Sequence, residues 1–182
     1  MNKKVKRLVF IAVYVAITIA LDYVKEMIPF LNLPQGGSIN IALIPIAFAS
    51  FHLGYKEGFI IGLLWWAISS LMGFNEWFLN PIQYLLDYIV PSFIVGLSSI
   101  VYKKNYVTVI LGIIITMIIR TFSIVISGTY YWPDGVAAGS KAAWIASLTY
   151  NLPYSIATMI VLLLVVPFLL RVFKERLKRF DV

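Results

Sequence analysis

Long apolar runs limit what this chain can fold into more than any other feature of its sequence. Hydrophobic residues make up 61% of the 182 positions and charged residues only 13%, whereas soluble domains have about 45–50% and 25%. A soluble fold of this length cannot bury so much apolar surface, so lipid has to form part of its solvent. The sequence therefore predicts an all-α integral membrane protein, a compact bundle of six transmembrane helices in a single domain, 1–182. The apolar stretches cover residues 7–28, 39–53, 57–73, 81–102, 106–128 and 141–170.

The lengths of the stretches differ. About 20 residues are needed to cross a bilayer as a helix, and the first, fourth, fifth and sixth stretches reach that length. The second is short and contains Pro45, and the third is near the lower limit. We expect both to be short or broken helices that neighbouring helices shield from lipid. We expect the first stretch to be a membrane helix and not a cleaved signal peptide, because no small-residue cleavage site precedes the charged cluster of Asp22, Lys25 and Glu26.

The basic residues predict the orientation of the bundle. With six crossings, twelve of the 15 lysines and arginines fall on one side. The positive-inside rule makes that side cytoplasmic and predicts a multi-pass protein of the cell membrane with both termini in the cytoplasm. Lys25 and Lys141 belong to the other side, and Arg120 lies within the fifth stretch. We interpret the basic ends as topology signals and contacts for lipid headgroups, not as a nucleic-acid surface.

Several kinds of chemistry lack the residues that they need. Cysteine is absent and His52 is the single histidine, so the sequence predicts no disulfide, no thiolate catalysis and no metal site. No phosphate-binding glycine-rich loop with lysine, nucleophile elbow or HExxH motif occurs. We therefore expect a protein that is not an enzyme, does not hydrolyse ATP by itself and needs no cofactor.

Three polar residues interrupt the apolar stretches at similar depths. At 1.5 Å per residue, Asp87 lies ~9 Å, Arg120 ~12 Å and Asn151 ~15 Å from the outer ends of their stretches. Ionisable groups at such depths are expensive and usually functional, and their convergence predicts a pocket in the outer half of the membrane for a small polar solute. Two alternatives stay open. One is that Asp87 and Arg120 form a buried structural ion pair instead of contacting a ligand. The other is that Asn151 makes only an interhelical hydrogen bond.

Aromatic residues surround the expected mouth of this pocket. They include Trp77, Tyr88, Trp132 and Tyr150. Tryptophan and tyrosine are ordinary belt residues at a membrane interface. Trp77 and Trp132, however, sit beside the predicted pocket, where stacking on a flat or cationic ring is worth roughly 0.5–2 kcal/mol for each indole.

Two series of small residues repeat at a spacing of four. They are Ala12, Ala16 and Ala20 in the first stretch, and Gly54, Gly58 and Gly62 at the start of the third. Faces of small residues allow close contact between helices in lipid. Each series either packs inside the bundle or docks onto another membrane protein.

Three segments are similar to a known family. The segments LPQGGSINIALIPI (33–46), NPIQYLLDYIV (80–90) and WIASLTYNLPY (144–154) resemble the thiamine-specific substrate-binding subunits of energy-coupling factor (ECF) transporters. In that family a small membrane subunit, the S-component, captures a vitamin from outside and docks on a module of one transmembrane coupling protein and two ATPases, which drives uptake. The resemblance thus implies that this chain binds thiamine and that Ala12 and Ala16 contact the coupling protein.

The resemblance also implies roles for five residues. Asp87 corresponds to the acid that hydrogen-bonds the aminopyrimidine, Tyr88 to the tyrosine that follows it, and Asn151 to the asparagine of the sixth helix. Trp132 matches the tryptophan that stacks on the ligand, and Trp77 matches an aromatic residue of the loop before the fourth helix. Thiamine suits these groups, since it carries an amine, ring nitrogens and a permanent cation.

Two positions depart from the family pattern. Ile124 stands where a histidine is common and Ala146 where a tyrosine is common. Both changes remove a polar group that would face the ligand, which leaves room for a related pyrimidine or thiazole compound or another vitamin. Tyr150 is a candidate to replace the lost hydroxyl. A stand-alone secondary transporter with Asp87 as a proton or cation relay remains an alternative from a different class, although the chain has no duplicated half.

Overall fold

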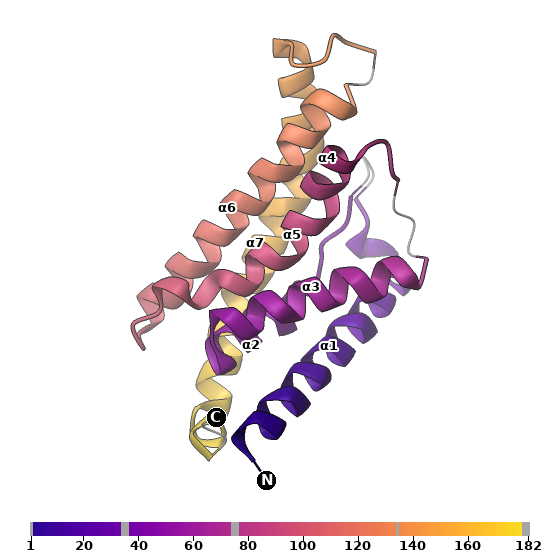
Figure 1. Ribbon diagram of the computed structural model, residues 1–182. Coiled ribbons are helices and arrows are strands. Elements are labelled where there is room, and N and C mark those ends of the chain that lie inside the picture. The colour runs from indigo at the N-terminus through magenta and orange to yellow at the C-terminus, as the bar shows by residue number, and fades with distance from the viewer. Residues whose placement is uncertain (1, 34–36, 74–76, 134, 180–182) are drawn as a thin grey trace.

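The computed structural model describes residues 2–33, 37–73, 77–133 and 135–179, and its helices form a bundle with both termini at one end (Figure 1). The elements in chain order are α1 (Lys3–Met27), η1 (Pro29–Leu31), α2 (Leu43–Leu53), α3 (Tyr55–Leu71), α4 (Pro81–Tyr84), η2 (Leu85–Ile89), α5 (Val90–Phe93), η3 (Ile94–Val101), α6 (Tyr106–Tyr131) and α7 (Lys141–Arg179). η1 and η3 are 3-10 helices and η2 is a π-helical turn. The elements from α4 to η3 follow one another without a break, so the described residues form the six helical segments that the sequence predicts.

Four of these segments are long and apolar enough to cross a membrane. They are Lys3–Met27, Pro81–Val101, Tyr106–Tyr131 and Lys141–Phe173. These are the first, fourth, fifth and sixth stretches, as predicted. The helices α2 and α3 are the short ones, as expected from their sequences.

Several helix ends differ from the predicted ones. α1 begins at Lys3 and α7 continues to Arg179, because polar and basic residues extend the helices beyond their apolar parts. Asn2 caps α1, where its side chain accepts a hydrogen bond from the backbone N–H of Lys4. α2 begins only at Leu43, since Asn40 before it turns the chain and accepts a hydrogen bond from the backbone N–H of Ala42.

The prediction that neighbouring helices shield both short helices is right for α2 and wrong for α3. Every residue of α2 except Ile44 and His52 is buried. On α3 the buried residues follow one face from Gly58 to Ser69, and the opposite face leaves Ile60 and Leu64 about 40% exposed (42% and 39%). Such a one-sided helix packs on the bundle along one stripe and presents the other to the surroundings.

The glycine series of α3 packs inside the bundle. A side-chain carbon at Gly58 would overlap the carbonyl oxygen of Gly96, and one at Gly62 would overlap the backbone of Ser92. Glycine is therefore required for the close approach of α3 to α5 and η3. Gly54 has a different role, because its φ of 116° makes the sharp connection between α2 and α3.

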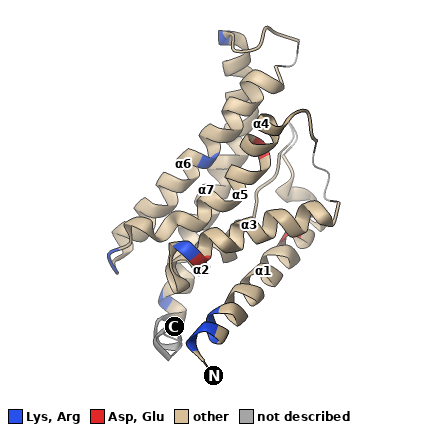
Figure 2. Cartoon of the chain, in the orientation of Figure 1, with Lys and Arg blue, Asp and Glu red and all other residues tan. Residues whose placement is uncertain are grey.

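The alanine series of α1 does not pack inside the bundle. Ala12, Ala16 and Ala20 are exposed, and α1 turns Tyr14, Thr18 and other residues inward instead. Figure 2 shows the lysines and arginines of the described chain gathered mainly at the end of the bundle that holds both termini.

Candidate ligand-binding site

A cavity of about 570 Å³ opens in the half of the bundle away from the termini. Its wall combines the last turns of α1 and α3 with the π turn η2, the first turn of α5 and the middle of α6. The residues that line it are Asp22, Lys25, Glu26, Asn40, Trp65, Trp66, Ser69, Gly73, Asp87, Tyr88, Pro91, Ser92 and Arg120. Of the predicted site residues, Asp87 and Tyr88 line this cavity, and the polar residue Arg120 joins them.

The carboxylate of Asp87 is held by two donors. Nε2 of Gln83, one turn earlier, donates to Oδ2 at 2.7 Å, and Nε1 of Trp132 at the end of α6 donates to the same oxygen at 3.0 Å. Gln83 is fully buried, and its amide also bonds to the backbone of Trp77 and Leu79. Both hydrogen bonds to the carboxylate are charge-assisted and therefore fix its position more strongly than neutral ones would.

The two predicted tryptophans reach the site in different ways. Trp132 contacts Asp87 through its indole N–H. Trp77 contacts the site through its backbone N–H, which donates to the hydroxyl of Tyr88 at 2.9 Å. Trp77 is 71% exposed and Trp132 is 40% exposed, and neither residue is part of the cavity wall.

Asn151 is buried in α7 but does not line the cavity. Its amide nitrogen donates to the carbonyl oxygen of Ser147 at 2.9 Å, and its oxygen accepts a hydrogen bond from the hydroxyl of Tyr154. These partners belong to the same helix, so the alternative of an interhelical hydrogen bond is wrong for the described residues. Tyr150 is 46% exposed and packs edge-on against the ring of Tyr154.

The alternative of a structural ion pair between Arg120 and Asp87 is wrong for the described residues. No ion pair joins the two side chains within the described part of the chain, where the donors to Asp87 are Gln83 and Trp132, both at Oδ2. Arg120 is only 9% exposed, and its Nε and Nη1 atoms have no hydrogen-bond partner among those residues. A buried guanidinium without acceptors is unfavourable, so Arg120 is suited to a ligand that brings an acceptor.

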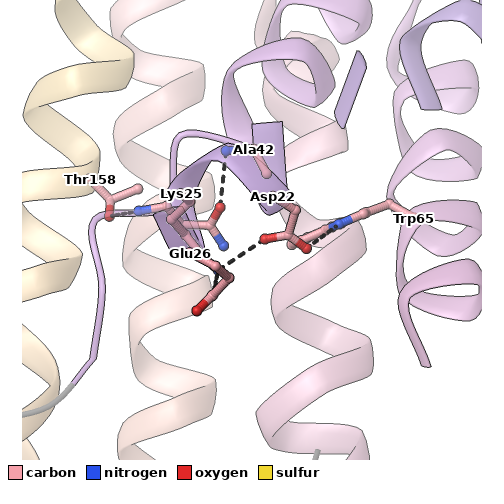
Figure 3. Close-up of polar contacts among 7 residues, drawn as sticks. Asp22, Lys25, Glu26, Ala42, Trp65 and Thr158 are labelled. Carbon is pink, nitrogen blue, oxygen red and sulfur yellow. Dashed lines mark hydrogen bonds and ion pairs between the residues drawn. The ribbon is translucent and has the colours of Figure 1, made fainter. Parts of the chain in front are cut away.

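The residues from α1 and α3 that line the cavity form a second polar cluster (Figure 3). Asp22 at the end of α1 is 5% exposed and accepts hydrogen bonds from Nζ of Lys25 at 2.9 Å and from Nε1 of Trp65 at 3.0 Å. Lys25 also pairs with Glu26 at 3.1 Å. The cluster ties α1 to α3 beside the cavity.

The charges around the cavity favour a cation. Three carboxylates (Asp22, Glu26 and Asp87) face two cationic side chains (Lys25 and Arg120), which leaves one net negative charge when all are ionised. A ligand with a single positive charge neutralises the lining, and charges interact more strongly in such a site than in bulk water.

Comparison with known proteins gives the family of the chain. The sequence model of the thiamine transporter protein family matches residues 12–178. The chain belongs to this family. It is 37% identical to the thiamine transporter ThiT of Bacillus subtilis (strain 168), in a match that covers 88% of each chain. Its fold matches the solved structure of ThiT from Listeria monocytogenes with a TM-score of 0.78 at 21% identity, over 97% of this chain and 99% of that one.

Membership of the thiamine transporter family, together with the four apolar helices, makes this chain a multi-pass membrane protein. The family resemblance assigns no ligand-binding role to Asp22, Lys25 or Trp65, which line the cavity. The available signal was a charged cluster at the end of an apolar helix, which is unusual enough to indicate a function. Ile124, which replaces the family's usual histidine, is buried in α6, whereas Ala146 is exposed on α7.

Proposed function

We propose that this chain is the S-component of an ECF transporter and captures thiamine from outside the cell. The observation that carries the proposal is the carboxylate of Asp87, fixed by two donors at the wall of a cavity with one net negative charge, in a member of the thiamine transporter family. Thiamine is a monocation with two planar rings joined by a methylene group, and its amine donates hydrogen bonds, so it complements this cavity in charge and in polarity.

The proposed ligand contacts follow from the atoms that are still unoccupied. Gln83 and Trp132 both bond to Oδ2 of Asp87, so Oδ1 is the oxygen proposed to accept the amine of the pyrimidine. The unpartnered nitrogens of Arg120 are proposed to turn toward an acceptor of the ligand, such as a pyrimidine ring nitrogen. An amine beside a ring nitrogen therefore suits a carboxylate and a guanidinium that line one cavity.

Aromatic residues are proposed to hold the two rings. The indole of Trp132 is fixed in place by its hydrogen bond to Asp87, which prepares it to stack on the cationic ring. The exposed side chain of Trp77 is proposed to cover the mouth, and Tyr88, which lines the cavity, to contact the ligand from the wall. Asn151 and Tyr150 contribute to the pyrimidine end after the ligand draws Asn151 away from its partners in α7.

Titration of the purified protein with thiamine tests the proposal. We expect quenching of tryptophan fluorescence at micromolar thiamine or below, because Trp132 lies beside the bound ring. Asp87→Asn should weaken binding at least about tenfold, since a charge-assisted hydrogen bond contributes about 1.5–3 kcal/mol. No quenching with the wild-type protein would reject thiamine as the ligand. Wild-type affinity in Asp87→Asn would remove this carboxylate from the site.

The membrane partners form the second part of the proposal. Both termini are proposed to lie in the cytoplasm, and the exposed alanines Ala12 and Ala16 are proposed to dock onto the coupling protein of a module that carries two ATPases. The exposure of this face supports docking. Ala16→Trp should abolish co-purification with the module while thiamine binding stays within about twofold of wild type. Retained co-purification would contradict the proposed docking face.

Transport by the chain alone separates the proposal from a stand-alone transporter. Proteoliposomes that contain only this chain should bind thiamine and show no uptake driven by a proton or cation gradient. Uptake driven by such a gradient would support the secondary transporter with Asp87 as a relay.

A further inference from the structure

The helical span that carries Asp87 changes its hydrogen-bond pattern at the cavity. In the π turn Leu85–Ile89 the backbone N–H of Val90 bonds to the carbonyl oxygen of Leu85, five residues earlier. In an α-helix it would bond to Leu86, four residues earlier. Single π turns of this kind often occur at functional sites.

This pattern leaves the carbonyl group of Leu86 without a backbone donor. Val90 is already bonded to Leu85, and the next residue, Pro91, has no N–H to donate. A partly buried carbonyl group that lacks a donor is unfavourable where water cannot reach it. The donor comes from another helix, because Oγ of Ser123 on α6 donates to the oxygen of Leu86 at 2.7 Å.

We propose that Ser123 is a positioning residue for ligand binding. Its hydroxyl satisfies Leu86 and so leaves Val90 free to bond to Leu85, which keeps the span in the π pattern at Asp87. Ser123 is itself 5% exposed, so water cannot easily replace its hydroxyl. The proposal rests on the proposed function, since the group that it positions is the carboxylate assigned to the vitamin.

Loss of the hydroxyl changes the balance between two patterns. Without Ser123, the N–H of Val90 satisfies Leu86 when the turn returns to the α pattern. That change rotates the part of the span that carries Asp87 relative to α6, which carries Arg120 and ends beside Trp132. Asp87 then loses its hydrogen bond with Trp132 and the direction in which it meets the ligand.

Calorimetric titration with thiamine tests this role. Ser123→Ala should weaken binding about fivefold, the range expected from one buried hydrogen bond. The matched control is Ser127→Ala, one turn further along α6, where the hydroxyl is fully buried but has no partner among the described residues. The control should stay within twofold of wild type. Wild-type affinity in Ser123→Ala, or a lower melting temperature with unchanged affinity, would overturn the proposal.

A second variant tests the mechanism. Pro91→Ala restores an N–H that can reach the carbonyl oxygen of Leu86, which makes the hydroxyl of Ser123 redundant. The affinities of Pro91→Ala and of the double variant, Pro91→Ala with Ser123→Ala, should therefore differ by less than twofold. If Ser123→Ala still weakens binding fivefold when Pro91→Ala is present, as expected when Pro91 is intact, Ser123 does not act through this carbonyl group.

A measurement without ligand separates this inference from the proposed function. The protein is labelled with 5-fluorotryptophan, and the ¹⁹F signal of Trp132 is assigned from its loss in Trp132→Phe. This signal should shift in Ser123→Ala, where the bond to Asp87 is lost, and should stay in place in Ser127→Ala. An unshifted signal in Ser123→Ala overturns the positioning role. If the wild-type protein fails to bind thiamine, the proposed function fails while this signal still decides the role of Ser123.

Discussion

Gln83 determines how firmly the carboxylate of Asp87 is held, and Gln83→Leu removes its amide while nearly preserving its volume. The side chain is fully buried and makes three hydrogen bonds, to Oδ2 of Asp87 at 2.7 Å, from the N–H of Leu79 at 3.0 Å and to the carbonyl of Trp77 at 3.2 Å. The first is charge-assisted and contributes about 1.5–3 kcal/mol, and neutral bonds contribute about 0.5–1.5 kcal/mol each.

The two backbone bonds of Gln83 belong at the low end of that range. Leu79 and Trp77 are 52% and 71% exposed, so water can replace the lost amide at both. Burial of the leucine side chain returns roughly 1 kcal/mol. The variant should therefore lower the free energy of unfolding by about 2 kcal/mol, measured by unfolding in detergent micelles.

Gln83→Leu should also weaken thiamine binding. A carboxylate that has lost one of its two donors has to be immobilised by the ligand, which costs about 0.5–1.5 kcal/mol, or about two- to tenfold in affinity. Asn80→Ala is the matched control. Asn80 caps the same helix at the N–H groups of Ile82 and Gln83, so its loss should lower stability by about 1 kcal/mol and leave the affinity unchanged. Equal affinities for Gln83→Leu and wild type would refute the reasoning.

Two further predictions concern the packing around the cavity. Asp22→Ala should lower the free energy of unfolding in detergent by about 2–3 kcal/mol, because it leaves the buried N–H of Trp65 without an acceptor. The control Glu26→Ala, at a half-exposed position, should change this free energy by less than about 1 kcal/mol. Similar values for both variants would contradict the role of Asp22. Gly58→Ala should destabilise the bundle by about 1–3 kcal/mol, because the new methyl group overlaps the backbone at Gly96. An unchanged melting temperature would show that α3 and η3 can move apart without loss of stability.

Much of the fold follows from the lengths of the apolar stretches, because an apolar helix in lipid has few alternatives. The exposure of α3 could not be predicted in this way, since apolar residues occupy both faces of that helix and only packing shows which face is buried. The extension of α1 and α7 into basic segments does not follow from the apolar stretches either, because the charged residues at these ends are helical but not apolar.

The candidate site was predicted in part. Asp87 stood out because an ionisable residue in an apolar span is rare, and the cavity wall contains it. The alternative of a structural ion pair with Arg120 is wrong for the described residues, where Gln83 and Trp132 are the donors to the carboxylate. The π turn depends on a serine 37 residues further along the chain, which no local pattern reveals. The roles of Asn151, Tyr150 and Trp77 in binding stay predictions.

Calorimetric titration of wild type and Asp87→Asn with two ligands tests the central claim most directly. The ligands are thiamine and an analogue in which hydrogen replaces the amino group of the pyrimidine. If Asp87 accepts a hydrogen bond from that amine, Asp87→Asn should weaken binding of thiamine at least about tenfold. The same variant should change binding of the analogue by less than about threefold. Equal losses for both ligands, or no loss for either, would contradict the account.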